Sequence, residues 1–169
     1  AINSEFPDIT LLMTFGHSLA IGDRHNLPPA LYGLLPAFLD GVLEAQHNDT
    51  TVIDGLEFAY PFKKREEFET LRAIMRIHGK ETSAVPELYE KRMKLALGIW
   101  SDHNSGTKGW GPHHPEKDHF QPKEIEDSIR YALELTDGYV WLYSERLNWY
   151  TRRAVTEPYL LAVANAQSP

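Results

Sequence analysis

Apolar and polar positions follow one another along the chain in blocks, with four short apolar runs separated by longer segments of helical spacing. Each run is rich in β-branched or aromatic residues, opens after a turn signal and closes on polar residues. This pattern is typical of strands buried on both faces. The predicted strands are FPDITLLMTFG (6–16), TTVIDGLEFAY (50–60), KLALGIWSDH (94–103) and DGYVWLYSE (137–145).

Between these runs, apolar residues recur three or four positions apart, as they do on one face of an amphipathic helix. The spacing predicts helices around Phe38–Leu43, Phe68–Met75 and Ile125–Leu133, a weaker helix over 158–166, and a loop with a short helix within 78–94. Strands that alternate with helices imply a parallel sheet with helical crossovers. We therefore predict an α/β fold of (βα)4 pattern, in one domain over residues 1–169.

Two architectures accommodate this pattern: an open doubly wound sheet, and half of a (β/α)8 barrel of the TIM type. No G-x-G-x-x-G or G-x-x-x-x-G-K-[ST] motif follows any strand, which favours the half-barrel. A complete barrel needs about 250 residues, and half of one exposes two strand edges and an apolar face. We therefore expect either a homodimer that completes the barrel or a missing N-terminal half. A self-contained four-stranded α/β domain is the alternative.

Composition narrows the range of partners. The net charge is −7 and the basic residues form no cluster, so a nucleic-acid partner is not expected. The chain has no cysteine, which leaves its compartment open, and no apolar run reaches membrane-spanning length. The start, AINSEFPD, lacks the basic and apolar regions of a signal peptide and reads like a piece cut from something longer.

Polar residues stand where the predicted strands end, which in parallel α/β folds is where catalytic side chains converge. Three of the four predicted strands bring a carboxylate to this rim: Asp54 and Glu57, then Asp102, then Glu145. Adjacent strands lie about 4.8 Å apart, so these carboxyl groups could reach the separation that a retaining or inverting glycosidase needs. Each carboxylate could instead cap the following helix or pair with a loop cation.

Several of these segments also carry a resemblance. The phrases FPDITLLMTFG, LLPAFLDGVLEA, TTVIDGLEFAY and ELTDGYVWLYSE resemble the C-terminal half of uncharacterised bacterial (β/α)8 proteins that are similar to glycoside hydrolases. The resemblance implies that these strands are the fifth to eighth of a barrel. It places Asp102 on the seventh strand, where many barrel glycosidases carry the nucleophile. Their acid/base is usually on the fourth strand, which this chain lacks, so Glu57, Glu145 or a second copy would have to supply it.

Our leading interpretation is a glycosidase-like hydrolase. Asp102 is predicted to be the nucleophile or base, and Glu57 or Glu145 the acid. Flat side chains with polar edges hold sugar rings in water, and the candidates for substrate contact are Trp110, Trp149, Tyr150, His17 and Asp54. These tryptophans could equally close over the core. The third interpretation is a non-catalytic barrel fragment that pairs with itself.

The second interpretation is a serine ester hydrolase. Gly16-His17-Ser18-Leu19-Ala20 is close to the G-x-S-x-G nucleophile elbow of α/β-hydrolases. With Ser18 as nucleophile, Asp102 and His103 could complete a triad. Ala20 replaces the second glycine of the motif, and the following IGDRHNLPP predicts a loop rather than a helix.

No cofactor and no dedicated metal site are predicted. The segment GWGPHHPEKDHF gathers metal-ligating side chains, namely His113, His114, Glu116, Asp118 and His119. Neighbouring histidines in an irregular loop do not by themselves give the convergent geometry that zinc requires. A metal at the barrel mouth stays open as a smaller alternative, bound by His17, His25 or His103 with Asp102 or Glu57.

Overall fold

The computed structural model describes residues 2–47, 49–103 and 115–168. The chain forms two compact units. We call residues 1–56 and 70–96 the first unit, and residues 57–69 and 97–169 the second unit.

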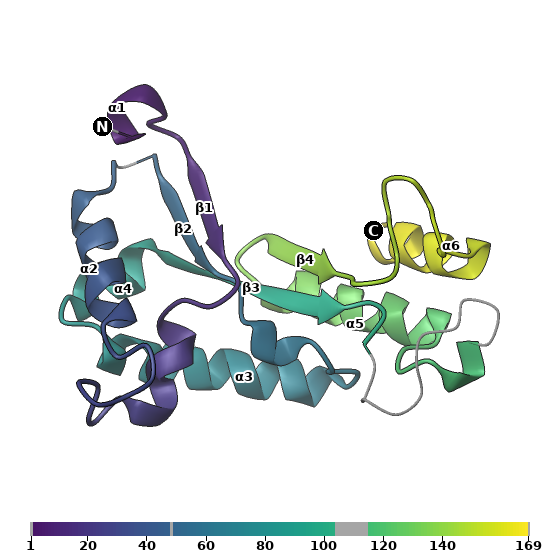
Figure 1. The fold of residues 1–169 in the computed structure, drawn as a ribbon, viewed down its shortest axis with the longest axis horizontal. Helices are drawn as coiled ribbons and strands as arrows, with labels where there is room; N and C mark the ends of the chain where they lie inside the picture. Colours follow the sequence, from purple (N-terminus) through teal and green to yellow (C-terminus); the bar gives the residue numbers. More distant parts are fainter. Residues whose placement is uncertain (1, 48, 104–114, 169) are drawn as a thin grey trace. The chain divides into compact units, whose positions relative to one another are not determined.

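The strands form a single sheet in the order β1-β2-β3-β4, with all strands parallel (Figure 1). Their bounds are β1 Thr10–Met13, β2 Thr51–Asp54, β3 Met93–Trp100 and β4 Tyr139–Tyr143. The register pairs Thr10 with Thr51 and Val52 with Met93. A parallel sheet with sequential strand order and helical crossovers confirms the predicted α/β, (βα)4 pattern. This order is also the one found in half of a (β/α)8 barrel.

The predicted helices are also present. They are α2 Leu35–Ala45, α3 Arg65–His78, α4 Pro86–Arg92, α5 Pro122–Leu135 and α6 Glu157–Ala166. A further short helix, α1 Ile2–Glu5, precedes β1. Short 3-10 turns lie at η1 His17–Asp23, η2 Glu57–Ala59, η3 Gly79–Thr82 and η4 Pro115–Lys117. The segment IGDRHNLPP (21–29), predicted as a loop, begins inside the 3-10 turn η1. Within the described ranges no helix combines the length and apolar character needed to cross a bilayer.

Burial differs between the central and outer strands. Strands β2 and β3 are almost wholly buried, as predicted. The same prediction is wrong for β1, whose residues alternate between exposed and half-buried, and for β4, which is mostly half-buried. The reason is their place in the sheet: β1 and β4 are the outermost strands, so each has a neighbouring strand on one side only.

In the first unit, the core lies between the sheet and two helices. Helices α2 and α4 lie beside each other in Figure 1 and contact each other. Their buried residues Leu43 and Tyr89 pack with Val52 of β2 and Met93 of β3. Pro36 and Pro86 stand in the first turns of α2 and α4, where a missing backbone N–H costs nothing.

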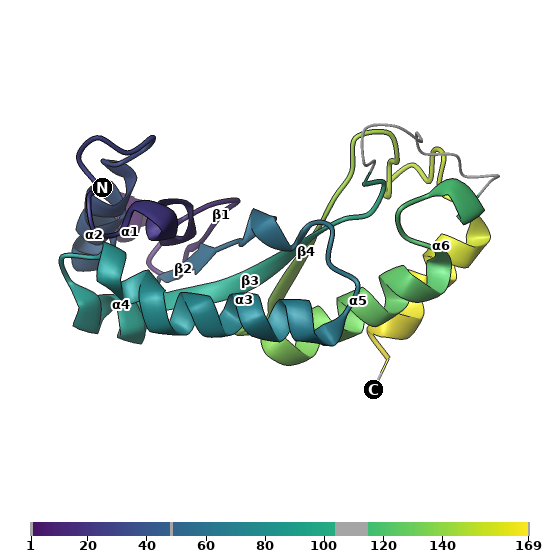
Figure 2. The same cartoon turned by 90° about the horizontal axis from the view of Figure 1, so that it is seen from below.

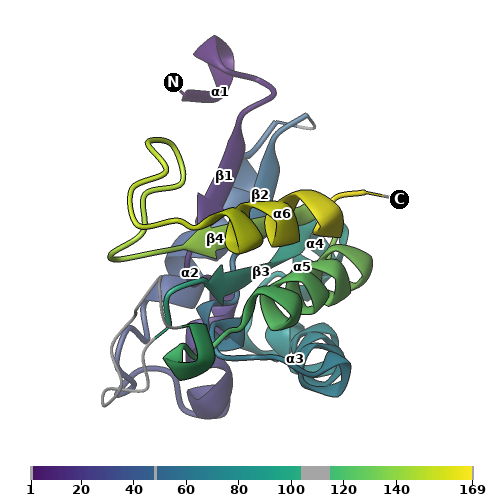
Figure 3. The ribbon, with the colours of Figure 1, turned by 90° about the vertical axis from the view of Figure 1, so that its right-hand side faces the viewer.

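In the second unit, the core is built around α5 and α6, which lie side by side in Figure 2 and Figure 3. The apolar face of α5 buries Ile125, Ile129 and Ala132. Tyr159 of α6 is fully buried, and its hydroxyl donates to the Phe120 carbonyl oxygen at 2.8 Å. The segment before α5 is thereby fixed to α6.

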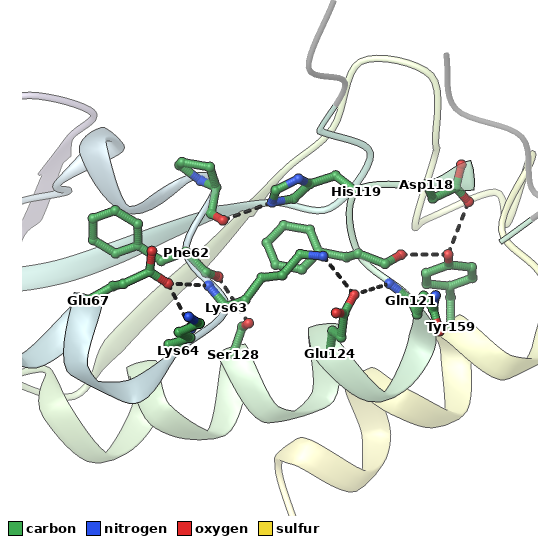
Figure 4. Close-up of polar contacts among 12 residues, drawn as sticks. Phe62, Lys63, Lys64, Glu67, Asp118, His119, Gln121, Glu124, Ser128 and Tyr159 are labelled. Carbon is green, nitrogen blue, oxygen red and sulfur yellow. Dashed lines mark hydrogen bonds and ion pairs between the residues drawn. The ribbon is translucent and has the colours of Figure 1, made fainter. Parts of the chain in front are cut away.

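Polar contacts attach residues 57–69 to α5 within the second unit (Figure 4). The Ser128 hydroxyl donates to the Phe62 carbonyl at 3.1 Å, and Lys63 Nζ donates to Glu124 Oε2 at 2.8 Å. Burial pushes the pKa of Glu124 upward, but hydrogen bonds from the Gln121 N–H and from Lys63 outweigh it and leave that pKa below its usual value. These contacts hold in place the segment that carries Glu57.

Candidate functional site

At the end of β3, Asp102 acts as an anchor for the turn after β4. Its carboxylate accepts Trp100 Nε1–H at 2.8 Å and the backbone N–H groups of Glu145 at 3.1 Å, Arg146 at 2.6 Å and Leu147 at 3.1 Å. Asp102 is only 3% exposed. A buried carboxylate needs such donors to offset its lost hydration. The hydrogen bonds of Asp102 therefore fix the position of Glu145.

The two other predicted catalytic carboxylates, Glu57 and Glu145, are each hydrogen-bonded to a tyrosine. The Tyr60 hydroxyl donates to Glu57 Oε1 at 2.5 Å, and the Tyr143 hydroxyl donates to Glu145 Oε1 at 3.4 Å. The rings of Tyr60 and Tyr143 stack with centroids 5.4 Å apart and an interplanar angle of 13°. Glu57 and Glu145, from η2 and from the end of β4, are thus brought to one place.

The charges around these tyrosines are acidic. Burial raises the pKa of Tyr143, and the carboxylates of Glu145, Asp102 and Glu57 raise it further. Burial also raises the pKa of Tyr60, with the Glu57 hydrogen bond and charge next in size. All three predicted catalytic carboxylates therefore act electrostatically on Tyr143, so they share one neighbourhood in the second unit.

Aromatic rings from β3 and β4 extend this neighbourhood. Trp100 meets Tyr60 and Tyr143 edge-on, at centroid distances of 5.8 and 5.4 Å, and Trp141 meets Tyr60 at 5.3 Å. Gly98 makes room for them, because a Cβ there would lie 2.8 Å from the Trp141 ring. We call this group the aromatic–carboxylate site; it comprises Glu57, Tyr60, Trp100, Asp102, Tyr143 and Glu145.

Sequence reasoning did not single out the rings of this site. Trp141 and Tyr143 stand two positions apart on β4, so their side chains leave the same face of the sheet. That spacing, with a glycine in the neighbouring run 94–103, is the signal from which the stack could have been inferred. Nothing in the sequence indicates that Tyr60 would cover them, because it comes from a distant segment.

His103 packs between Trp100 and a second histidine, His119. The His103 ring is 4.8 Å from Trp100 and 4.6 Å from His119, measured between centroids. His119 Nε2 is hydrogen-bonded to the Pro61 carbonyl at 2.8 Å (Figure 4), while His103 Nδ1 is buried with no hydrogen-bond partner among the described residues. Burial lowers the pKa of His103, and the charge of His119 lowers it further.

The aromatic residues predicted to bind substrate differ in their exposure to solvent. Trp149 is half-buried and donates from Nε1 to the Ser101 hydroxyl at 3.3 Å. Tyr150 is fully exposed. Trp110, with His113 and His114, lies outside the described residues.

In the first unit, Ser18 and Asp54 form a closed polar cluster. The Ser18 hydroxyl donates to Asp54 Oδ1 at 2.7 Å, and the backbone N–H groups of Gly16 and Ser18 donate to the same carboxylate at 2.9 and 2.8 Å. Burial raises the pKa of Asp54, and the hydrogen bonds from Ser18, Gly16 and Leu56 offset part of that rise. Ser18 is 4% exposed and Asp54 is fully buried. Asp54 therefore anchors the turn after β1.

His17 is fully buried in the same unit and pairs with Asp40. Its Nε2 lies 3.0 Å from Asp40 Oδ1, and Asp40 also accepts the Ser83 hydroxyl at 2.6 Å and the Ala84 N–H at 2.7 Å. In the predicted triad, Ser18 and Asp102 have other hydrogen-bond partners. The Ser18 hydroxyl donates to Asp54, and the described hydrogen bonds of Asp102 come from Trp100 and the backbone of 145–147. The structure does not bring Ser18, Asp102 and His103 together through any described hydrogen bond.

Across residues 2–47, 49–103 and 115–168, no group of three or more His, Asp or Glu side chains could hold a metal ion. His25, one of the histidines considered for such a site, is exposed. No protein-family model matches this sequence, and no curated protein and no solved structure matches it.

Proposed function

We propose that the protein is a hydrolase that cleaves glycosidic bonds at the aromatic–carboxylate site. One observation carries this proposal: Glu57 and Glu145 each accept a hydrogen bond from one of two stacked tyrosines, beside the ring of Trp100. Two carboxyl groups near each other are what glycoside hydrolysis requires. Aromatic faces with polar edges are what a sugar ring packs against.

The contacts support a division of roles among the carboxylates. Glu57 receives a 2.5 Å hydrogen bond from Tyr60, which orients it as a nucleophile or base must be oriented. Glu145 is exposed and bonded to Tyr143 at 3.4 Å, so it can turn toward a leaving-group oxygen and protonate it. Asp102 was predicted as the nucleophile; its four donors favour a positioning role, in which it holds the turn that carries Glu145.

The test is turnover of a panel of nitrophenyl glycosides beside short acyl esters. Glu57→Gln and Glu145→Gln should each lower glycoside kcat by roughly a hundredfold or more, the usual contribution of a positioned acid or base. Glu66→Gln is the matched control, because Glu66 is an exposed glutamate of the same unit.

The variant Ser18→Ala tests the alternative serine mechanism. Glycoside turnover should be indifferent to this change, because Ser18 is buried and bonded to Asp54. Ester turnover that Ser18→Ala abolishes would replace the proposal with a serine hydrolase. No turnover of any substrate in the panel would favour the non-catalytic fragment.

We also propose that the chain pairs with a second copy. In the first unit, β1 has only β2 as a neighbouring strand among the residues that the structure describes. An apolar groove of about 500 Å³ is lined by Leu11 of β1, Phe38 and Val42 among others. Phe38 is 67% exposed. Large exposed apolar surface of this kind marks an interaction site.

Solution mass tests the pairing. The parent chain should be a dimer, and Phe38→Glu should shift it toward the monomer. Leu161→Glu is the control, because Leu161 is an exposed apolar residue of α6 in the other unit. A well-behaved monomeric parent would contradict the proposal.

A further inference from the structure

A small pocket in the first unit gathers cations at the end of the sheet where β2 and β3 begin. It has a volume of about 180 Å³ and lies at Thr51 and Lys94, near the first residues of these strands, whereas Asp54 is the last residue of β2. The pocket therefore lies at the opposite end of β2 from Asp54. Its lining residues are Gln46, Thr50, Thr51, Lys91, Arg92 and Lys94.

The charge of this pocket is opposite to that of the chain. The protein carries a net charge of −7, yet Lys91, Arg92 and Lys94 line the pocket together and no carboxylate lines it. In the part of the chain that the structure describes, none of the three forms an ion pair with a carboxylate. Like charges held together repel each other unless an anion sits between them.

Arg92 is fixed in place by the helix beside it. Its Nη1 donates to the carbonyl oxygens of Leu43 at 2.6 Å and Gln46 at 3.4 Å, at the carboxyl end of α2. A guanidinium has five N–H donors, so these bonds leave donors for a ligand. Lys91 and Lys94 are exposed at the rim and can bend over a bound group.

Gln46, which lines the pocket, carries a buried oxygen without a hydrogen-bond partner among the described residues. Gln46 is only 8% exposed, and its Nε2 donates to the Thr50 carbonyl at 3.3 Å, which sets the orientation of the amide. Turning the amide over would place Oε1 against that carbonyl oxygen. Oε1 is buried and has no hydrogen-bond partner among the described residues. Leaving a buried acceptor unpaired is unfavourable, so a donor belongs at this position.

We propose that this pocket binds inorganic phosphate. The anionic oxygens would lie among Lys91, Lys94 and Arg92, and the remaining P–O–H would donate to Gln46 Oε1. Sulfate has the same shape but no hydrogen to donate at neutral pH. A phosphate monoester loses its last proton at a pH near about 6, so above that pH it cannot make this bond either. The volume suits a small ion better than a metabolite, since pockets for larger ligands are of roughly 300 Å³ or more.

Binding there would join α2, α4 and the first residues of β2 and β3. Because a ligand that binds only the folded state stabilises it by mass action, phosphate should raise the stability of the first unit. This inference is independent of the proposed hydrolase activity. It would make the chain sensitive to free phosphate through a site at the opposite end of β2 from Asp54.

The test is a titration of backbone amide NMR signals with sodium phosphate, sodium sulfate and methyl phosphate, at pH 7.5 and constant ionic strength (about 0.15 M, the physiological value). Phosphate should shift the amide signals of Gln46, Thr50 and Thr51 and should bind several-fold more tightly than the other two anions. Lys91→Gln with Lys94→Gln should weaken phosphate binding by about tenfold or more. The control pair Lys64→Gln with Lys117→Gln removes the same charge from exposed sites of the second unit.

Gln46→Met separates the role of the amide from the role of the cations. It should abolish the preference for phosphate over sulfate while leaving sulfate binding in place. No saturable shift with any anion, or equal weakening by both lysine pairs, would overturn the site. Equal affinity for phosphate and sulfate in the parent chain would overturn the role of Gln46 Oε1.

Discussion

Asp54 in the first unit and Asp102 in the second unit are built alike and surrounded differently. Each stands at or just after the end of a strand and collects donors from the turn that follows the neighbouring strand. Asp54 takes the backbone N–H groups of Gly16 and Ser18, and Asp102 those of Glu145, Arg146 and Leu147. In each case a carboxylate holds a turn at the carboxyl end of the sheet.

The difference lies in what the held turn presents. The turn held by Asp54 presents Ser18 and His17, which are both buried and bonded to carboxylates. The turn held by Asp102 presents Glu145, which is exposed and faces the stacked tyrosines that also hold Glu57. An anchoring carboxylate at a strand end is therefore compatible with a closed structural cluster and with an accessible site. The predictions below test this comparison, beginning with the largest effect.

Removing either anchor should destabilise the protein strongly. Asp54→Ala and Asp102→Ala each remove a buried carboxylate and leave several N–H donors without their partner, which should lower the free energy of unfolding by about 3–5 kcal/mol. Urea denaturation measures this loss, and Glu66→Ala, at an exposed position, should change it by no more than about 0.5 kcal/mol.

Amide hydrogen exchange separates the two anchors. Asp102→Asn should expose the N–H groups of 145–147 and leave those of Gly16 and Ser18 protected, and Asp54→Asn should do the reverse. Loss of protection in both turns from either single change would mean that the anchors do not act separately.

Adding a methyl group beneath the aromatic rings should cost less. A Cβ at position 98 would lie 2.8 Å from the Trp141 ring and 2.9 Å from Tyr60, so Gly98→Ala should destabilise by about 1–3 kcal/mol through overpacking. Gly41→Ala, inside α2 with nothing within 4 Å, should instead stabilise by about 0.5–1 kcal/mol. Thermal or urea unfolding gives both signs, and a neutral Gly98→Ala would mean that the ring stack is loose.

Removing one hydroxyl from the stack should have a smaller effect. Tyr60→Phe keeps the ring but deletes the hydrogen bond to Glu57, which should cost about 1 kcal/mol. Tyr150→Phe provides the matched control at a fully exposed tyrosine. Equal stability of the two variants in urea would show that the Tyr60 hydroxyl does not hold Glu57.

The smallest effect concerns pH. Burial and His119 lower the pKa of His103 in the folded chain below its ordinary value of 6.5, so the unfolded chain binds this proton more readily. The contribution of His103 to stability is therefore fully present above pH 6.5 and is lost as the pH falls from 6.5 to the folded-state pKa. NMR titration of the His103 ring should give a midpoint below that of a free histidine peptide. His119→Gln should raise the midpoint without restoring it, since burial is the larger cause.

Much of the fold could be predicted from apolar spacing. The runs around Val52 and Leu97 lie in the middle of the sheet, where both faces are covered, so a continuous apolar pattern indicated strands correctly. The same rule was wrong about the burial of β1, because this outer strand has a neighbouring strand on one side only in the described sheet. Apolar content does not reveal strand order.

The site could be predicted only in part. Glu57, Asp102 and Glu145 were predicted as candidates because carboxylates at or near the ends of predicted strands are visible in a sequence. The hydrogen bonds of Asp102 could not be predicted, because they come largely from the backbone N–H groups of 145–147, and residue type does not reveal backbone donors. Tyr60 was missed for a related reason, since its partner Tyr143 is far away in the sequence.

The most direct test of this account compares the parent chain with Glu145→Gln in two ways: kcat on the panel of nitrophenyl glycosides, and amide exchange of residues 145–147. The account predicts a kcat lower by about a hundredfold or more, with exchange unchanged from the parent, because the carboxyl group reacts while Asp102 still holds the turn. An unchanged kcat, no turnover by the parent, or a loss of protection equal to that of Asp102→Asn would contradict it.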